Sequence, residues 1–170
     1  MWLIDKSGNT PFWYAAARGN FDTCEFLIES ATDKNPKCFD NWTPFHVAAS
    51  EGHLNVCELI SDNVTDQSPV TNEGETPLYF AALENHLDIC KLLMAKVEDK
   101  NPANNEGLTP LHLAAHHGYF ELYKYILERV KEKNPQDNDG RTPLHEAIDN
   151  GKFQICRIYV DVLGIENPTK

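Results

Sequence analysis

Apolar side chains recur at helical spacing in segments that lie 33 residues apart. In two of these segments the positions i, i+3, i+4 and i+7 are held by Cys57, Ile60, Ser61 and Val64, and by Cys90, Leu93, Met94 and Val97. Three of the first four residues and all of the second four are apolar, which indicates amphipathic helices about two turns long. The alternation that is typical of strands fits these segments less well.

The same period governs the segments that precede these helices. From Thr10, Thr43, Thr76, Thr109 and Thr142 the chain reads TPFWYAAARGNF, TPFHVAASEGHL, TPLYFAALENHL, TPLHLAAHHGYF and TPLHEAIDNGKF, without one insertion. A period of this length predicts one supersecondary unit that is copied along the chain and buries its apolar face against its neighbours. The sequence therefore predicts an all-α repeat solenoid, one domain over residues 1–170, with repeats at approximately 5–37, 38–70, 71–103, 104–136 and 137–169.

Each repeat carries signals for two helices and an extended finger. The Thr-Pro pair starts the first helix, because the Thr hydroxyl caps a free backbone N–H and Pro needs no donor in the first turn. This helix is expected to stop at residue types that tolerate a left-handed backbone, namely Gly19, Gly52, Asn85, Gly118 and Gly151. The second helix is followed by Asn-Pro, or by Ser68-Pro69, and then by turn residues such as Glu73-Gly74, which together predict a β-turn finger.

The Thr-Pro-Leu-His-x-Ala-Ala motif in this arrangement resembles the ankyrin repeat family over residues 5 to about 167. The resemblance implies a stack of helix pairs with fingers at right angles, and a concave groove that binds other proteins. The motif His is structural in that family, which accounts for His46, His112 and His145 without a metal ion. Trp13 and Tyr79 replace this His in the first and third repeats, so its side chain-to-backbone bonds are expected to be altered there.

The chain departs from the family pattern where each second helix ends. The family usually has Gly at this position, whereas this sequence has an apolar residue: Ala31, Val64, Val97, Val130 and Leu163. We therefore expect a second helix that runs slightly longer, with the apolar residue packed into the core.

Charge and composition restrict the classes of partner. The chain has 170 residues, with 26 Asp and Glu against 15 Lys and Arg, and a net charge of −11 that opposes nucleic-acid binding. No apolar run approaches the roughly eighteen residues of a membrane span and no signal-peptide pattern opens the chain, so we expect no membrane partner. Reduced thiols in the core favour a cytoplasmic location, with the nucleus as the alternative. These thiols are Cys24, Cys57, Cys90 and Cys156, and Cys38 in a finger is the candidate for an exposed thiol.

Neither a catalytic site nor a metal site stands out from the repeat pattern. No Gly-rich phosphate loop or Gly-x-Ser-x-Gly elbow is present, so we expect no enzyme activity and no cofactor. Two His one helical turn apart, such as His112 and His116, begin the coordination sphere of several zinc enzymes. Zinc needs three or four converging ligands, and only a carboxylate such as Glu84 or Asp149 is placed to join His116 and His117. We therefore interpret these two His as groove residues rather than as metal ligands.

Finger tips and the ends of first helices can vary without harm to the fold, and the binding site is predicted there. Phe39 and Trp42 are the strongest candidates for a binding hot spot, although Trp42 can instead brace its finger against the next. The acidic residues of this set form either a solvated surface or a site for a partner with basic and apolar side chains. The predicted partner-binding residues are Phe39, Asp40, Trp42, Glu51, Glu73, Glu75, Leu83, Glu84, Glu106, Leu108, His116, His117, Arg141 and Asp149.

Several alternatives to a free-standing protein-binding scaffold stay open at this point. The chain can be a small-ligand or metal-ion sensing module, or a regulatory segment of a larger enzyme or channel. It can be a fragment of a longer array, and either a monomer or a weak end-to-end assembly. Asn35, Asn101 and Asn134 match positions that can be hydroxylated in the family.

Overall fold

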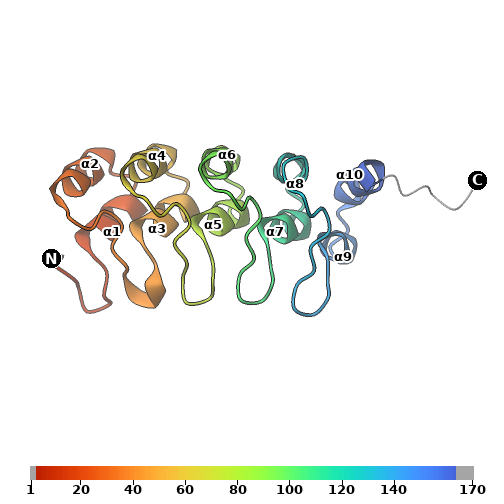
Figure 1. Ribbon diagram of the computed structural model, residues 1–170, viewed down its shortest axis with the longest axis horizontal. Helices are drawn as coiled ribbons and strands as arrows, with labels where there is room; N and C mark the ends of the chain where they lie inside the picture. The colour runs from red at the N-terminus through yellow and green to blue at the C-terminus, as the bar shows by residue number, and fades with distance from the viewer. Residues whose placement is uncertain (1–2, 164–170) are drawn as a thin grey trace, which may run out of the picture. The chain divides into compact units, whose positions relative to one another are not determined.

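The computed structural model describes residues 3–163, and within that range the chain forms ten α-helices, one 3₁₀ turn and no strand. This confirms the all-α repeat solenoid as the fold class. The elements are α1 Pro11–Ala17, α2 Phe21–Ser30, η1 Phe39–Asn41, α3 Pro44–Ser50, α4 Leu54–Asn63, α5 Pro77–Leu83, α6 Leu87–Lys96, α7 Pro110–His117, α8 Phe120–Leu127, α9 Pro143–Asp149 and α10 Phe153–Leu163 (Figure 1). No helix in this range is both long enough and apolar enough to span a bilayer.

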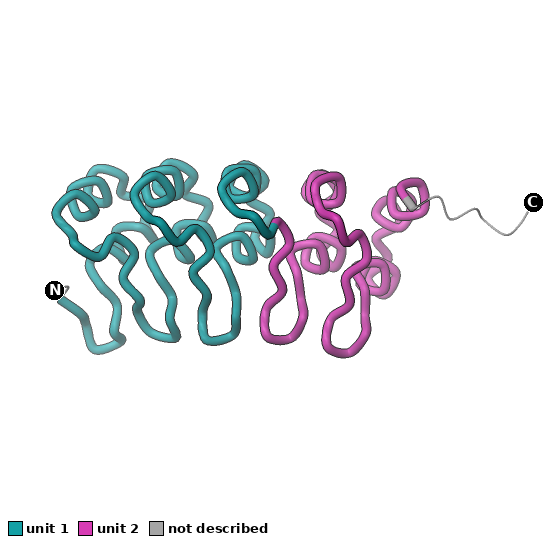
Figure 2. Tube along the Cα trace, in the orientation of Figure 1, with its two compact units in different colours: residues 1–99 teal, residues 100–170 magenta. Residues whose placement is uncertain are grey.

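The chain divides into two compact units, residues 1–99 and residues 100–170 (Figure 2). In unit 1, α1, α3 and α5 contact one another in sequence, and α2, α4 and α6 form a second layer against them. In unit 2, α7 contacts α9, α8 contacts α10, and each first helix contacts the second helix of its own repeat. Each unit is therefore a two-layer stack of helix pairs, and a single domain over residues 1–170 stays a prediction.

Five short turns, which we call the first to fifth fingers, precede the first helices. They are residues 5–9, 38–42, 71–75, 104–108 and 137–141, and in each the first residue's N–H donates to the fifth residue's carbonyl, at 2.6 to 3.0 Å. In unit 1 the first three project to the same side (Figure 1). Fixed spacing along the chain thus becomes a row of exposed tips at one edge of each unit.

A reciprocal cap at the Thr-Pro pair starts α3, α7 and α9. At α3 the backbone N–H of Thr43 donates to His46 Nδ1 at 3.1 Å, and the Thr43 hydroxyl oxygen lies 2.9 Å from the same nitrogen. The cap satisfies backbone donors that a helix start leaves free, and such a cap contributes about 1 kcal/mol. In the first and third repeats only the Thr hydroxyl caps the helix, accepting from the N–H of Trp13 or Tyr79.

The same His side chain links its repeat to the next one. Because Nδ1 of His46 accepts from Thr43, Nε2 carries the proton and donates to the carbonyls of Pro69 at 3.0 Å and Glu75 at 3.1 Å. In unit 2 Nε2 of His112 donates to the Arg141 carbonyl at 3.2 Å. We call this contact the histidine bridge: it connects a first helix to the finger that follows.

A second His position links neighbouring repeats at the other end of the first helices. His53 Nε2 donates to the Ala17 carbonyl at 3.1 Å, and His86 Nε2 donates to the Ser50 carbonyl at 2.9 Å. The contact requires glycine at position 19, where φ is 64° and a Cβ would lie 2.5 Å from the His53 ring. These bonds satisfy carbonyls that helix ends leave without a partner.

The core is formed by the apolar stripes of the second helices and the Ala pairs of the first. Cys57, Ile60 and Ser61 are buried as the spacing predicts, whereas Val64 is only half-buried and is the extended residue after α4. Ala31 and Val97 are placed likewise, so the longer second helix was a wrong expectation in all three. The fourth repeat shortens instead: α8 ends at Leu127, three residues before Val130.

The five cysteines, all in the described range, are free thiols. Cys24, Cys57 and Cys90 are buried, and burial raises the pKa of Cys24 to about 11 and that of Cys90 to about 12. Cys156 is only half-buried. The prediction of an exposed Cys38 was wrong, because the residue is half-buried and its sulfur lies 3.8 Å from the Thr10 hydroxyl and from the Pro36 carbonyl.

Acid should weaken the fold through His46. Burial lowers the pKa of His46 to about 4, below the value of 6.5 expected for the unfolded chain. Between these two pH values His46 is therefore protonated in the unfolded chain and neutral in the folded chain. This stabilisation is complete above pH 6.5 and is lost as the pH falls toward 4. Between pH 7 and pH 5 we expect His46 to remove about 2 kcal/mol from the free energy of unfolding, measured by urea denaturation.

The variant His46→Gln should be less stable than the native chain at pH 7 and should lose about 2 kcal/mol less on acidification. His145→Gln is the control, because His145 forms the same cap with Thr142 but has an exposed side chain. An acid response equal to the native one in His46→Gln would contradict this assignment.

Candidate functional site

The second finger differs from the other four in backbone and side chains. Fingers one, three, four and five have Gly at their fourth residue, with φ between 77° and 81°, whereas the second has Asn41 with φ 60°. Asp40 before it is also left-handed, with φ 52°, and the segment forms the turn η1. A left-handed non-Gly residue costs about 1 kcal/mol or more, and such strain is common at functional sites. The turn leaves the side chain of Phe39 66% exposed.

Asparagine side chains fasten neighbouring finger tips together elsewhere in the chain. The backbone N–H of Asn72 donates to the Asp40 carbonyl at 3.0 Å, and its side-chain amide donates to Asp40 Oδ1 at 3.2 Å. Asn138 ties the fifth finger to the fourth in the same way: its backbone N–H donates to the Glu106 carbonyl at 3.0 Å, and its side-chain amide donates to the Asn105 carbonyl at 2.8 Å. We call this contact the asparagine tie.

Both links are missing between the first and second fingers. Phe39 occupies the position of Asn72, and it forms no hydrogen bond to residues 5–9. Trp13 occupies the position of His46, and its Nε1 is buried without an acceptor in the described chain. On this side the two repeats retain the weak contact between Thr10 and Cys38.

A cleft of about 640 Å³ opens where these links are missing. Its walls are the first finger, the exposed tip of the second finger and two tryptophans; the lining residues are Lys6, Ser7, Gly8, Asn9, Trp13, Phe39, Asp40 and Trp42. The first finger is held by Asp5, whose carboxylate accepts from the N–H groups of two finger residues and from the Tyr14 hydroxyl at 2.7 Å. The Tyr14 hydrogen bond contributes most to the lowered pKa of Asp5.

Trp42 serves mainly as a brace for the second finger. Its side chain is half-buried, and its ring centroid lies 4.3 Å from that of Phe80 and 5.9 Å from that of His46. Offset contact between aromatic rings at this distance stabilises a fold beyond simple burial. Of the two predicted hot-spot residues, Phe39 is therefore the free one, and Trp42 offers one edge to the cleft.

The other predicted residues of unit 1 divide by exposure. Glu51, Glu73 and Glu84 are exposed, whereas Leu83 and Glu75 are half-buried. The Glu75 carboxylate accepts from the Thr71 hydroxyl at 3.1 Å, within its own finger. Residues 1–99 contain 16 Asp and Glu against six Lys and Arg, and residues 100–170 contain ten against nine. The acidic excess thus belongs almost entirely to unit 1.

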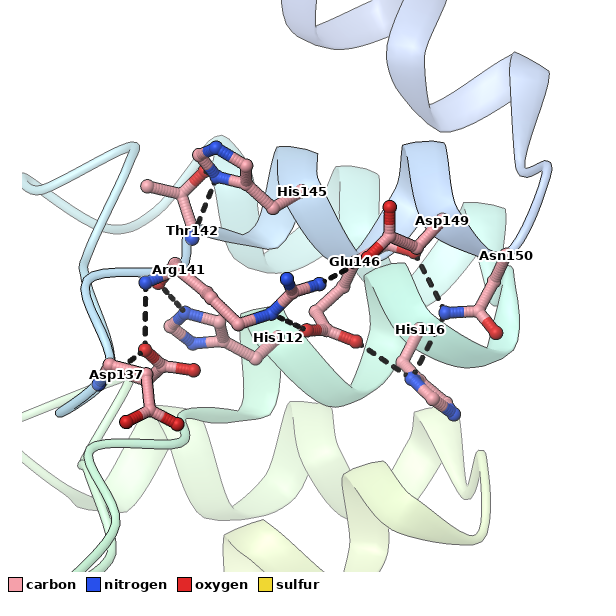
Figure 3. Close-up of polar contacts among 10 residues, drawn as sticks. His112, His116, Asp137, Arg141, Thr142, His145, Glu146, Asp149 and Asn150 are labelled. Carbon is pink, nitrogen blue, oxygen red and sulfur yellow. Dashed lines mark hydrogen bonds and ion pairs between the residues drawn. The ribbon is translucent and has the colours of Figure 1, made fainter.

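In unit 2 a charge network engages three of the predicted residues (Figure 3). Arg141 Nε donates to Glu146 Oε1 at 2.9 Å and its terminal nitrogen donates to Asp149 Oδ2 at 2.6 Å. His116 Nδ1 lies 2.8 Å from Glu146 Oε2 and 3.2 Å from the side-chain amide nitrogen of Asn150. Burial raises the pKa of Glu146, but the hydrogen bonds from His116 and Arg141 outweigh that effect and lower it. The carboxylates of Glu146 and Asp149 thus balance the positive charge of Arg141 within the protein.

The two His side chains at the end of α7 contact groups on neighbouring elements. Glu146 is the carboxylate that contacts His116, and not Glu84 or Asp149, which the sequence suggested as its companions. The ring of His117 stacks on Tyr119 with centroids 5.1 Å apart. Among the described residues no three His, Cys, Asp or Glu side chains gather as a metal ion would require.

Comparison with known proteins decides the family. The model of the family described as "Ankyrin repeats (3 copies)" matches residues 1–68, 33–104, 61–137 and 97–168. This chain belongs to the ankyrin repeat family. No curated protein sequence matches it significantly. Ankyrin repeats are generally non-enzymatic modules that bind other proteins.

Two of the Asn residues before the fingers of this ankyrin repeat chain, Asn35 and Asn101, hold backbone in place. Asn35 Oδ1 accepts from the Phe45 N–H at 3.2 Å, and Asn101 Oδ1 accepts from the Leu111 N–H at 3.0 Å. Asn134 Oδ1 is buried without a hydrogen-bond partner in the described chain. Hydroxylation at these positions stays a prediction.

The predicted partner-binding set does not include Trp13 and Glu146, which the structure places at these sites. Both carried a signal within the ankyrin repeat pattern. Trp13 stands at the motif His position, and Phe39 stands where other fingers have Asn, so two missing links fall between the same two repeats. Glu146 lies one turn before Asn150 on the polar α9, but its contact with His116 depends on packing between α7 and α9.

Two predicted partner-binding residues lie in the fourth finger. Glu106 is exposed and Leu108 is half-buried.

Different contributions to the fold are expected from the two aromatic residues of the second finger. Trp42→Ala should lower the free energy of unfolding by about 2 kcal/mol, because it removes the ring contact with Phe80. Phe39→Ala should lower it by less than about 0.5 kcal/mol, because the side chain is already exposed. Urea denaturation followed by circular dichroism measures both, and equal losses would refute the division into brace and free aromatic.

Proposed function

We propose that this protein is a non-enzymatic scaffold that binds a protein or peptide partner through the fingers and first-helix ends of unit 1. The proposed partner presents basic side chains next to an apolar one. The observation that carries the proposal is the coincidence, in one unit, of the exposed Phe39 with exposed carboxylates at finger tips and first-helix ends. Support comes from Asp40, Glu51, Glu73 and Glu84, all exposed.

Electrostatics supports a basic partner. A surface with 16 acidic against six basic side chains in residues 1–99 attracts cationic segments at long range and repels acidic ones. Rim charges of this kind accelerate association more than they strengthen the complex, whereas a buried aromatic anchor dominates the affinity. Phe39 has the exposure that such an anchor needs before binding.

The second unit contributes less to this proposal. Arg141, Asp149 and His116 are engaged in an internal network, so a partner would have to break those bonds in order to use the same side chains. Glu106 is exposed and stays a candidate contact. We place the principal site in unit 1 for this reason, and a regulatory role within a larger enzyme or channel is compatible with it.

The proposal is tested by selecting binders from a random peptide display library against the native protein. Enriched peptides should contain Lys or Arg together with an aromatic or aliphatic residue, and their affinity should fall about threefold or more when salt rises from low to several hundred millimolar. Enrichment of acidic peptides, or no enrichment, would contradict the proposal.

A matched pair of triple variants locates the site. Glu51→Gln/Glu73→Gln/Glu84→Gln should weaken a selected peptide about fivefold to tenfold, because it removes three carboxylates from the proposed surface. Glu25→Gln/Glu29→Gln/Glu58→Gln removes the same charge from exposed positions on α2 and α4 and should change affinity less than about twofold. Equal effects of the two variants would assign the attraction to net charge alone.

A further inference from the structure

The cleft between the first and second fingers has the composition of a cation site. Trp13, Phe39 and one edge of Trp42 supply aromatic surface, and Asp40, an acidic residue, lines the same wall. Only Oδ1 of Asp40 accepts a bond, from Asn72 at 3.2 Å, so Oδ2 remains available in the described structure. Aromatic faces attract cations, and a carboxylate beside them adds direct charge pairing.

The cleft lies where two links between neighbouring repeats are replaced. The histidine bridge and the asparagine tie link the second repeat to the third, and both are replaced between the first and second by aromatic residues. Trp13 and Phe39 thus remove two links and at the same time line the space that opens. The left-handed pair Asp40 and Asn41 holds the carboxylate and the exposed ring at the tip.

We propose that this cleft binds the guanidinium group of an arginine side chain in the partner, between the aromatic rings and against the Asp40 carboxylate. The inference rests on the proposed function and names the residue that its principal pocket recognises. Guanidinium is planar and weakly hydrated, stacks on aromatic faces and pairs with a carboxylate through two parallel N–H groups. An ammonium group is more strongly hydrated and lacks the planar fork, and a wholly apolar side chain leaves the Asp40 carboxylate without a counter-charge.

One residue of the wall opposes this ligand. Lys6 lines the cleft with an exposed side chain, and its charge repels a cation. Its long flexible stem lets the ammonium group turn toward solvent, so it weakens rather than prevents binding. The sign of its effect is therefore a specific consequence of the proposal: neutralising Lys6 should strengthen arginine binding.

The test uses capped pentapeptide probes titrated into the ¹⁵N-labelled full chain, with the assigned indole N–H signals of Trp13 and Trp42 as the readout. The arginine probe is acetyl-Gly-Gly-Arg-Gly-Gly-amide, and its neutral match carries citrulline in place of arginine. Saturable shifts of both signals with a Kd on the order of millimolar are expected for the arginine probe, and at least about fivefold weaker binding for citrulline. Equal binding of citrulline, or tighter binding of a leucine, phenylalanine or lysine probe, would overturn the assignment.

Three variants at the cleft test the geometry. Asp40→Asn should weaken the arginine probe about fivefold, and Lys6→Gln should strengthen it about twofold. Phe39→Asn introduces the residue that forms the asparagine tie in other fingers and should abolish the shifts, while urea denaturation should show that the fold is retained. Arginine binding that is indifferent to Asp40→Asn and Phe39→Asn would refute the site.

Failure of this inference is distinguishable from failure of the proposed function. If library-selected basic peptides bind the native chain but leave the indole signals of Trp13 and Trp42 unmoved, unit 1 binds a basic partner elsewhere and the arginine cleft is refuted. If no peptide is enriched and the arginine probe still gives saturable shifts that depend on Asp40, the cleft is supported and the peptide-binding scaffold is not.

Discussion

The structure depends on one buried imidazole held in a single protonation state. His46 accepts from the backbone of its own helix start through Nδ1, and therefore donates through Nε2 to carbonyls of the next finger. Its burial excludes water, which makes the bonds strong and the charged form unfavourable, with the pKa near 4. A local helix cap and a contact between repeats are thus made by the same ring. A residue that cannot both accept from the helix start and donate to the next finger cannot replace His46. Trp13, at the same position in the first repeat, therefore does not form the histidine bridge that links the second repeat to the third.

Local rules accounted for most of the fold. A Thr cap, a Pro in the first turn and a Gly or Asn at the end act within a few residues, so the sequence fixes the limits of the first helices closely. The second helices were less predictable, because their ends depend on what the chain packs against. Val64 is apolar enough to continue the buried stripe of α4. The helix nevertheless ends before it, because the Val64 backbone has β-type dihedral angles, and its side chain is only half-buried. The early end of α8 has no comparable signal in the apolar pattern.

The positions of the candidate site were predictable from the sequence, but which of its side chains are free to bind a partner was not. Repeat register identifies the finger tips, but whether a side chain is free depends on partners that are distant in the sequence. Trp42 packs on Phe80, 38 positions away in the chain, and Arg141 pairs with carboxylates on α9. Both pairings need the packed helices to exist before the side chains can meet. Phe39 is exposed because residues 3–163 offer it no such partner, and the absence of a partner is the hardest property to deduce from composition.

The cleft can form because a repeat protein is held together by separate contacts between neighbouring repeats. Each link between neighbouring repeats contributes stability, and the stack tolerates loss of one link because the other contacts between those repeats remain, here including the bond from His53 to Ala17. Between the first and second repeats both the histidine bridge and the asparagine tie are absent, so the loss of stability falls at one junction. Aromatic side chains stand there in place of the polar groups that form these links elsewhere. The same two substitutions therefore convert a structural junction into a recognition surface, without changing the helices on either side. A scaffold of this kind can acquire a pocket at any junction by the same route, and its position along the chain is marked by the positions at which the His and the Asn are missing together.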